Sequence, residues 1–231
     1  MASHHGPFGL PSGPFCFAFR AADAGLAVRS HGDRALTASL GGEMEALFLR
    51  AQDIPEFVAD GAADAGVTGW DLTLESGRTL ETALDLGFGA CKLVVAVKEE
   101  LPLTVLADLA PGTRVATPFP RIARQLRGAR GLQPEVIALS GAAEVAPHLG
   151  VADVVVDITS TGSTLRTNGL RVVETLLEST ARLIAPPETV AAMRAGRGKP
   201  MADLVLALDS VLRARGKRYV MANVPRAALD A

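Results

Sequence analysis

The sequence predicts an α/β protein in which strands and helices alternate along the chain. Short apolar runs rich in β-branched residues, such as 93–97 and 154–156, are typical of buried strands. Amphipathic stretches such as 204–213 are typical of helices that cover a core. Because alternating strands and helices usually form parallel units, we expect mostly parallel sheets.

The first part of the chain has a recognisable helix start at Asp53. Asp53 and Glu56 have the spacing of a capping box, and Gly61 is the expected stop of that helix. The other elements expected up to residue 97 are strands at 8–10, 46–50, 65–68 and 93–97 and helices at 14–25 and 71–77.

The second part of the chain continues the alternation. A helix is expected over 141–149, and the apolar spacing from residue 165 to residue 176 is closer to that of a helix than of a strand. The remaining expected elements are strands at 114–116, 136–139, 152–158 and 181–184 and helices at 117–128, 189–193 and 204–213.

Composition narrows the class of protein. The 231 residues are 48% apolar, which suits one large or two modest domains. The net charge of −2 argues against charge-driven nucleic-acid binding, and no apolar run approaches the ~20 residues that cross a bilayer. Cys16, Cys91 and the four histidines show neither a disulfide framework nor metal-ligand spacing. With no secretory signal visible either, we expect a cytoplasmic location and neither nucleic-acid nor membrane partners.

The strongest functional signal lies after the predicted strand at 152–158. Residues 159–164 are small and rich in hydroxyl groups, and a helix follows them. Such a loop presents backbone N–H groups to an anion, and Gly162 lets a phosphate approach the backbone. Ser, Thr and Gly also occur at such turns simply as caps and turn formers. Asp157, beside the loop, favours a sugar phosphate, because a carboxylate there can meet ribose hydroxyls or a metal ion.

The pattern from Glu144 to Leu165 resembles, without a gap, the signature of the ATP phosphoribosyltransferase family. The matching positions are Glu144, Gly150, Ala152, Val155, Asp157, Ile158, Thr161, Gly162, Thr164 and Leu165. Further similar stretches follow the family order at 53–55, 66–71, 84–93, 114–120, 139–147 and 179–186. The resemblance implies a pentosyltransferase that transfers 5-phosphoribose from phosphoribosyl pyrophosphate (PRPP) to N1 of ATP. That reaction gives phosphoribosyl-ATP and pyrophosphate and is the first step of histidine biosynthesis.

The same resemblance implies two α/β lobes like those of type II periplasmic binding proteins, with a cleft between them. Residues 1–92 and 181–231 would form the first lobe, on the ATP and pyrophosphate side. Residues 93–180 would form the second lobe, with the PRPP phosphate loop. The length implies a short form with no C-terminal regulatory domain, although truncation of a longer chain would give the same ending. A short form implies a regulatory subunit resembling histidyl-tRNA synthetase, and we expect a homodimer or larger oligomer.

The resemblance also assigns site residues. Catalysis can rest on positioning and electrostatics, because the attacking ring nitrogen has a free lone pair and needs no deprotonation. The implied catalytic residues are Asp157, Glu144 and Arg34. Mg²⁺ is the implied cofactor, with no residue assigned as its ligand. The residues implied to bind PRPP are Asp157, Ser160, Thr161, Gly162, Ser163, Thr164 and Leu165, and those implied to bind ATP are Leu10, Asp53, Gly69 and Asp71.

Each polar candidate also has a purely structural interpretation. Asp157 could cap the turn that follows its strand, and Glu144 could simply begin a helix, where a carboxylate is favoured. The capping box explains Asp53 without a ligand, and Arg34 could be a surface arginine.

Two departures from the family pattern bear on turnover. Where the family has two cations near the N-terminus, this chain has Ser12 and Pro14. An arginine there would stabilise the developing pyrophosphate charge by about 2–4 kcal/mol. The alternative function is therefore a non-catalytic or regulatory homologue that binds PRPP or nucleotide without turnover. A solute-binding protein of the same shape is disfavoured by the phosphate loop.

Overall fold

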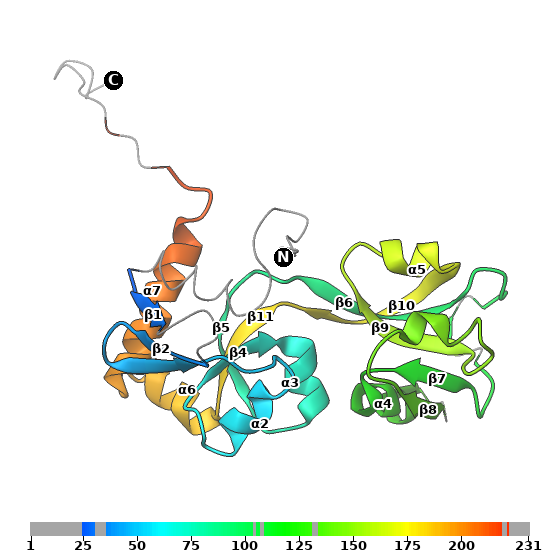
Figure 1. Ribbon diagram of the computed structural model, residues 1–231, viewed down its shortest axis with the longest axis horizontal. Coiled ribbons are helices and arrows are strands. Elements are labelled where there is room, and N and C mark those ends of the chain that lie inside the picture. The colour runs from blue at the N-terminus through cyan, green and yellow to red at the C-terminus, as the bar shows by residue number, and fades with distance from the viewer. Residues whose placement is uncertain are drawn as a thin grey trace.

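The computed structural model describes residues 25–30, 36–103, 105–106, 109–130, 134–218 and 221. It shows two α/β lobes side by side, joined by long strands that run from one lobe to the other (Figure 1). The expected strand at 8–10, the helix after Pro14, and residues Leu10, Ser12 and Arg34 lie outside the described residues.

The first lobe contains two antiparallel sheets of three strands each. One has the order β1 (Val28–Ser30), β2 (Thr37–Leu40), β3 (Met44–Leu47), and the other β4 (Gly66–Gly69), β11 (Ala181–Ala185), β5 (Glu81–Asp85). Its helices are α2 (Ile54–Ala59), α3 (Trp70–Ser76), α6 (Pro187–Arg194) and α7 (Lys199–Ala214). Leu204 and Leu208 of α7 pack with Leu86 and Leu40, while Ile184 packs with α2.

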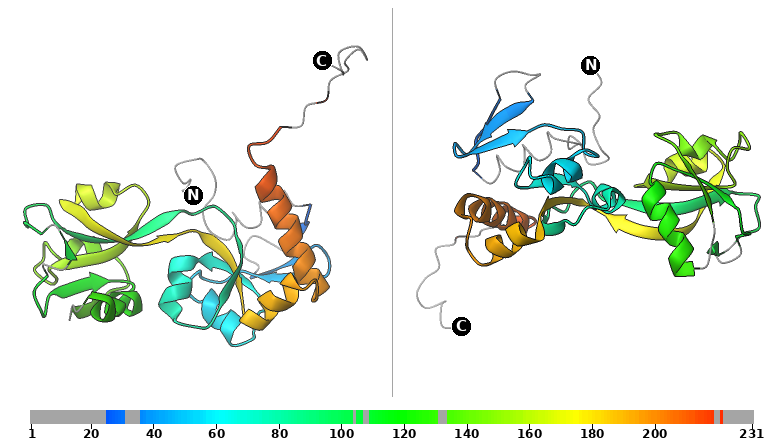
Figure 2. Two further views of the ribbon diagram at one scale, coloured as in Figure 1. Left: turned by 180° about the vertical axis from the view of Figure 1, so that it is seen from behind. Right: turned by 90° about the horizontal axis from the view of Figure 1, so that it is seen from below.

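The second lobe is built on one mixed sheet of five strands in the order β10-β6-β9-β7-β8. These strands are β6 (Cys91–Lys98), β7 (Arg114–Thr117), β8 (Glu135–Ala138), β9 (Val154–Thr159) and β10 (Leu170–Ser179). Among the described strands only the β7–β8 and β7–β9 pairs are parallel, so the expectation of mostly parallel sheets is wrong. The reason is that β6 and β10 pair antiparallel as they pass between the lobes, as the views of Figure 2 also show.

The sheet of the second lobe is buried on both faces. Leu93, Val95 and Val97 of β6 pack on the face that carries α4 (Pro120–Arg130). Val94 and Ala96 pack on the opposite face, beneath the 3₁₀ helix η2 (Ala143–Val145) and α5 (Ser163–Thr167). Burial on both faces explains why these strands read as continuous apolar runs.

Two elements differ from the expectation. The helix predicted over 141–149 is only the three-residue η2, followed by turns. The apolar residues after 169 belong to the strand β10, which carries register shifts between Val172 and Glu174 and between Thr175 and Leu177. No helix in the described residues is long and apolar enough to cross a membrane.

The parallel strands place three loops at one edge of the second lobe. The carboxyl ends of β7, β8 and β9 lie together, and the chain leaves β7 toward α4 on one face and β9 toward α5 on the other. Such a switch in direction is where α/β sheets commonly bind ligands.

Candidate functional site

The loop between β9 and α5 is held in shape by its own hydroxyl groups. The Gly162 amide donates to Thr159 Oγ1 at 2.8 Å, and the hydroxyls of Thr161 and Ser163 lie 3.0 Å apart. Gly162 has φ 72°, a left-handed conformation that side chains other than glycine's adopt at a cost. Leu165 is 4% exposed and anchors α5 in the core, so the loop before it is fixed at the sheet edge.

Several donors of this loop remain available to a ligand. Within the described part of the chain, the Ser160 and Thr164 hydroxyls and the Thr164 and Leu165 amides have no hydrogen-bond partner. The side chains of Ser160, Thr161, Ser163 and Thr164 are all exposed. Because α5 has only five residues, these direct donors, rather than a helix dipole, give the loop its attraction for an anion.

A cation that the sequence analysis did not single out lies beside the same loop. A Cβ placed on Gly162 would be 3.0 Å from Nη1 of Arg166. Arg166 is exposed and follows Gly162 by four residues, so both lie on one face of the first helical turn. That spacing is the signal in the sequence that would have identified it.

The structure brings Asp157 and Glu144 together. Asp157 is half-buried near the end of β9 and accepts a hydrogen bond from the Ile158 amide at 2.7 Å. Burial raises the pKa of the Asp157 carboxyl; the Ile158 amide opposes this and the Glu144 charge adds to the rise. A carboxyl whose pKa is raised by burial, with a second carboxylate beside it, is a common feature of functional sites.

The backbone before Glu144 is strained. Ala142, the residue before η2, has φ 52° and is the non-glycine residue with positive φ in the described chain. This conformation costs an alanine about 1–2 kcal/mol, and it persists because Ala143 and Ala146 are buried against the sheet. Glu144 follows Ala142 by two positions, in the η2 helix that packs beside β9, the strand of Asp157.

The first-lobe candidates include two carboxylates in different surroundings. Asp53 is partly exposed, and Asp71 is buried. The capping box predicted at Asp53 is wrong: Asp53 is the N-cap of α2 with αR dihedrals and makes no side-chain cap bond. A side-chain cap therefore does not explain Asp53, and contact between Asp53 and ATP stays a prediction. Asp71 is 5% exposed, and its Oδ1 accepts from Ser179 Oγ at 2.5 Å. A Cβ at Gly69 would overlap Asp71 Oδ1, so Gly69 makes room for this carboxylate.

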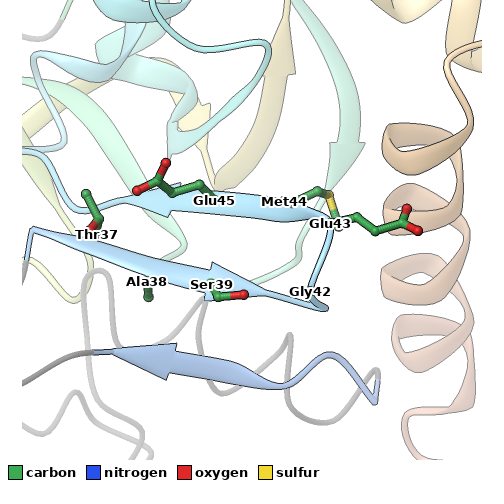
Figure 3. A pocket seen from close by; sticks show the side chains of 7 residues that line it. All are labelled: Thr37, Ala38, Ser39, Gly42, Glu43, Met44 and Glu45. Carbon is green, nitrogen blue, oxygen red and sulfur yellow. The ribbon is translucent and has the colours of Figure 1, made fainter.

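A hollow of about 330 Å³ lies elsewhere, on the hairpin of β2 and β3 (Figure 3). Its lining consists of Thr37, Ala38, Ser39, Gly42, Glu43, Met44 and Glu45. None of the predicted ligand-binding residues lines it, and its two charged side chains are the carboxylates of Glu43 and Glu45. These carboxylates would repel a polyphosphate, so the hollow does not fit the predicted substrates.

Comparison with known proteins decides the family. The family model described as HisG, ATP phosphoribosyltransferase, matches residues 50–209. The chain belongs to the ATP phosphoribosyltransferase family. It is 65% identical over 215 residues to the ATP phosphoribosyltransferase of Gemmatimonas aurantiaca, covering 90% of this chain and 73% of the relative. It is 44% identical over 209 residues to that of Methanocella arvoryzae, covering 90% and 72%.

Solved structures show the same fold. An ATP phosphoribosyl transferase (HisG:HisZ) complex from Thermotoga maritima matches with a TM-score of 0.72 at 22% identity, covering 85% of this chain and 92% of that one. The arginine-bound form of truncated ArgBP from T. maritima matches with a TM-score of 0.50 at 14% identity, covering 90% and 88%. The predicted resemblance to the two-lobed fold of periplasmic binding proteins is confirmed.

The family establishes the reaction. This member of the family is a pentosyltransferase that moves 5-phosphoribose from PRPP to N1 of ATP, in the first step of histidine biosynthesis. The substrates follow from the reaction, whereas the residues that bind them are a separate question.

Proposed function

We propose that PRPP binds at the carboxyl end of β9, with its 5′-phosphate in the loop from Ser160 to Leu165. The single observation that carries this proposal is the set of unpartnered donors there: two hydroxyls and two amides within six residues. Phosphate oxygens accept several such bonds at once, and Arg166 adds a positive charge beside Gly162.

Asp157 and Glu144 would orient the ribose. Asp157 precedes the phosphate loop by only three residues, which matches the short span between a 5′-phosphate and the ribose hydroxyls. Hydroxyl donors stabilise the ionised carboxylate, so substrate binding would offset the burial that raises the pKa of Asp157. Held in this way, the ribose presents its anomeric carbon to the ring nitrogen of ATP.

The carboxylate pair also fits magnesium brought by the substrate. No group of three or more Asp, Glu, His or Cys residues that could hold a metal occurs in the described chain. Mg²⁺ commonly binds through one or two carboxylates together with substrate phosphates, and Asp157 and Glu144 supply that number. When bound, Mg²⁺ would neutralise charge on the departing pyrophosphate.

The first lobe would supply the ATP side. Asp53 and Gly69 remain candidates there, and the adenine N1 needs no general base because its lone pair is free. Catalysis by this chain's residues would then consist of alignment and of favourable charge at the leaving group. Leu10 and Arg34 stay proposed contacts outside the described residues.

The chain's partners are also part of the proposal. The T. maritima structure is a HisG:HisZ complex, which supports a regulatory subunit for this chain as well. A homodimer or larger oligomer and a cytoplasmic location complete the proposal.

A binding experiment tests the phosphate loop. Thr164→Val removes one hydroxyl and should weaken PRPP binding in isothermal titration by at least ~1 kcal/mol, the value of one lost hydrogen bond. Thr167→Val is the matched control, because Thr167 is also exposed and lies at the far end of α5. Unchanged PRPP affinity in Thr164→Val would remove the loop from the site.

A turnover assay addresses Ser12 and Pro14. Protein mixed with PRPP, ATP and Mg²⁺, with and without a candidate regulatory subunit, should form phosphoribosyl-ATP. PRPP binding without product under both conditions would instead favour a homologue that has lost turnover.

A further inference from the structure

Helix α4 begins without a cap of its own. The residues before and at its start are Pro118, Phe119 and Pro120, none of which has a side chain that can accept from the first amides. Its first turn contains no acidic residue. An 11-residue helix whose first amides lack acceptors would be frayed at the edge that carries the phosphate loop.

The missing cap comes from the other lobe. Glu75, on α3, accepts hydrogen bonds from the amides of Arg121 at 2.8 Å and Ile122 at 2.9 Å, one at each carboxylate oxygen. The negative charge also suits the positive end of the α4 dipole. The Arg121 guanidinium in turn lies on Gly77, where a Cβ would overlap it. Because Gly77 ends α3 with φ 68°, the contact joins the C-terminal end of α3 to the N-terminal end of α4.

Two further contacts hold α3 in place. At its start, Asp71 accepts from Ser179 Oγ, at the end of β10 where the chain enters the first lobe. One residue on, Leu72 packs against the apolar cluster that includes Phe119 and Ile122. A helix that belongs to the first lobe by its chain connections is thus fixed to the second lobe through Leu72 and Glu75.

We propose that α3 sets the angle between the two lobes and that Glu75 is a positioning residue for the reaction. The contact holds the start of α4, and with it the loop after β7, against the lobe that carries Asp53 and Gly69. That loop adjoins the phosphate loop after β9, because β7 and β9 are neighbours in the sheet. Glu75 would therefore align the ATP side with the ribose while touching neither substrate.

The consequence for the reaction is a change in turnover rather than in PRPP binding. Attack by a ring nitrogen on the anomeric carbon depends on alignment, and a misplacement of about 1 Å can cost about 100-fold in rate. The loop that holds the 5′-phosphate lies within the second lobe and does not use Glu75. Loss of the cap should therefore lower kcat and leave PRPP affinity in place.

The test compares Glu75→Ala and Glu75→Gln with wild type. Glu188→Gln is the matched control, because Glu188 lies in the first turn of α6 and, within the described residues, makes no contact between the lobes. In Glu75→Ala, hydrogen exchange of the Arg121 and Ile122 amides should accelerate about 5- to 30-fold, as expected for a lost cap. The kcat should fall about 10- to 100-fold with PRPP affinity within 2-fold of wild type. Glu75→Gln keeps one acceptor oxygen, so its amide exchange rates and its kcat should lie between those of wild type and Glu75→Ala.

Three results would overturn the proposal: unchanged exchange at Arg121 and Ile122, unchanged kcat in Glu75→Ala, or a parallel loss of PRPP affinity. The exchange measurement uses no substrate. Failure of PRPP to bind the wild-type protein would therefore count against the proposed PRPP site and not against this contact.

Discussion

Gly162→Ala is the most informative change in the phosphate loop, because its two effects can be separated. An alanine at φ 72° costs about 1–2 kcal/mol of folding free energy. The added Cβ would lie 3.0 Å from Arg166 Nη1, but that guanidinium is the exposed end of a flexible side chain and can move. In a chain of this size, each kcal/mol lowers the melting temperature by about 2–4 °C. The melting temperature should therefore fall by about 2–8 °C.

Gly150→Ala is the matched control. Gly150 has φ 67° and open space around its Cβ position, so alanine there has the same backbone cost. Its carbonyl accepts from Arg114 at the start of β7, which places it at the edge of the sheet opposite the phosphate loop. Calorimetry should give similar falls in melting temperature for both variants.

PRPP binding should distinguish the two variants. In Gly162→Ala the methyl group occupies the approach to the loop amides and displaces Arg166, so PRPP affinity should fall about 5- to 30-fold, equivalent to one or two hydrogen bonds. Gly150→Ala should bind PRPP like wild type. Equal affinities in isothermal titration, or an equal loss in both variants, would refute the reasoning that a phosphate approaches the backbone at Gly162.

Two further predictions concern the half-buried carboxylate of Asp157 and the buried carboxylate of Asp71. Because burial raises the pKa of Asp157 above its unfolded value, the ionised group opposes folding above that pKa, and the opposition disappears when the group is protonated. Asp157→Asn should therefore melt higher than wild type at pH 7 while binding PRPP more weakly. The gain should shrink in melts at falling pH, and a lower melting temperature at pH 7 would contradict it. Ser179→Ala leaves the buried Asp71 carboxylate without its hydroxyl partner, so urea unfolding should show a loss of about 1.5–3 kcal/mol. A loss no larger than that of an exposed serine, such as Ser210→Ala, would contradict this second prediction.

The strands buried on both faces could be predicted well from sequence. The runs 93–97 and 154–156 are continuous, apolar and β-branched, and each is central in the second-lobe sheet. The candidate loop from Ser160 to Leu165 could also be located from sequence, because its donors come from consecutive residues; that it binds a phosphate stays a prediction. Local sequence contains all the information that such a segment needs.

β10 could not be predicted from periodicity, for a specific reason. Its two bulges each add a residue, so its exposed positions Val172, Thr175 and Glu178 recur every three residues. A period of three resembles a helix more than a strand of period two. The helix expected over 141–149 fails for another reason: Pro147 has no N–H to donate back to Ala143.

The contacts between the lobes were beyond the sequence analysis because they join distant residues. Glu75 lies 46 residues before Arg121, and nothing in the local pattern of either residue indicates the other. The failed capping box at Asp53 is the opposite case: the local signal was present, yet the side chain does not make the bond. Propensity permits a cap, but tertiary structure decides whether the carboxylate is used for it.

These contacts reduce the number of acidic candidates for ATP binding in the first lobe. The carboxylates of α3 are both engaged, Asp71 by Ser179 and Glu75 by α4. Within the described residues, the Asp53 side chain has no hydrogen-bond or ion-pair partner. A reaction that needs no general base does not need Asp53 for proton transfer, so its role there would be orientation. Asp53 is therefore the first-lobe carboxylate whose substitution should alter ATP binding without altering how the two lobes are held together.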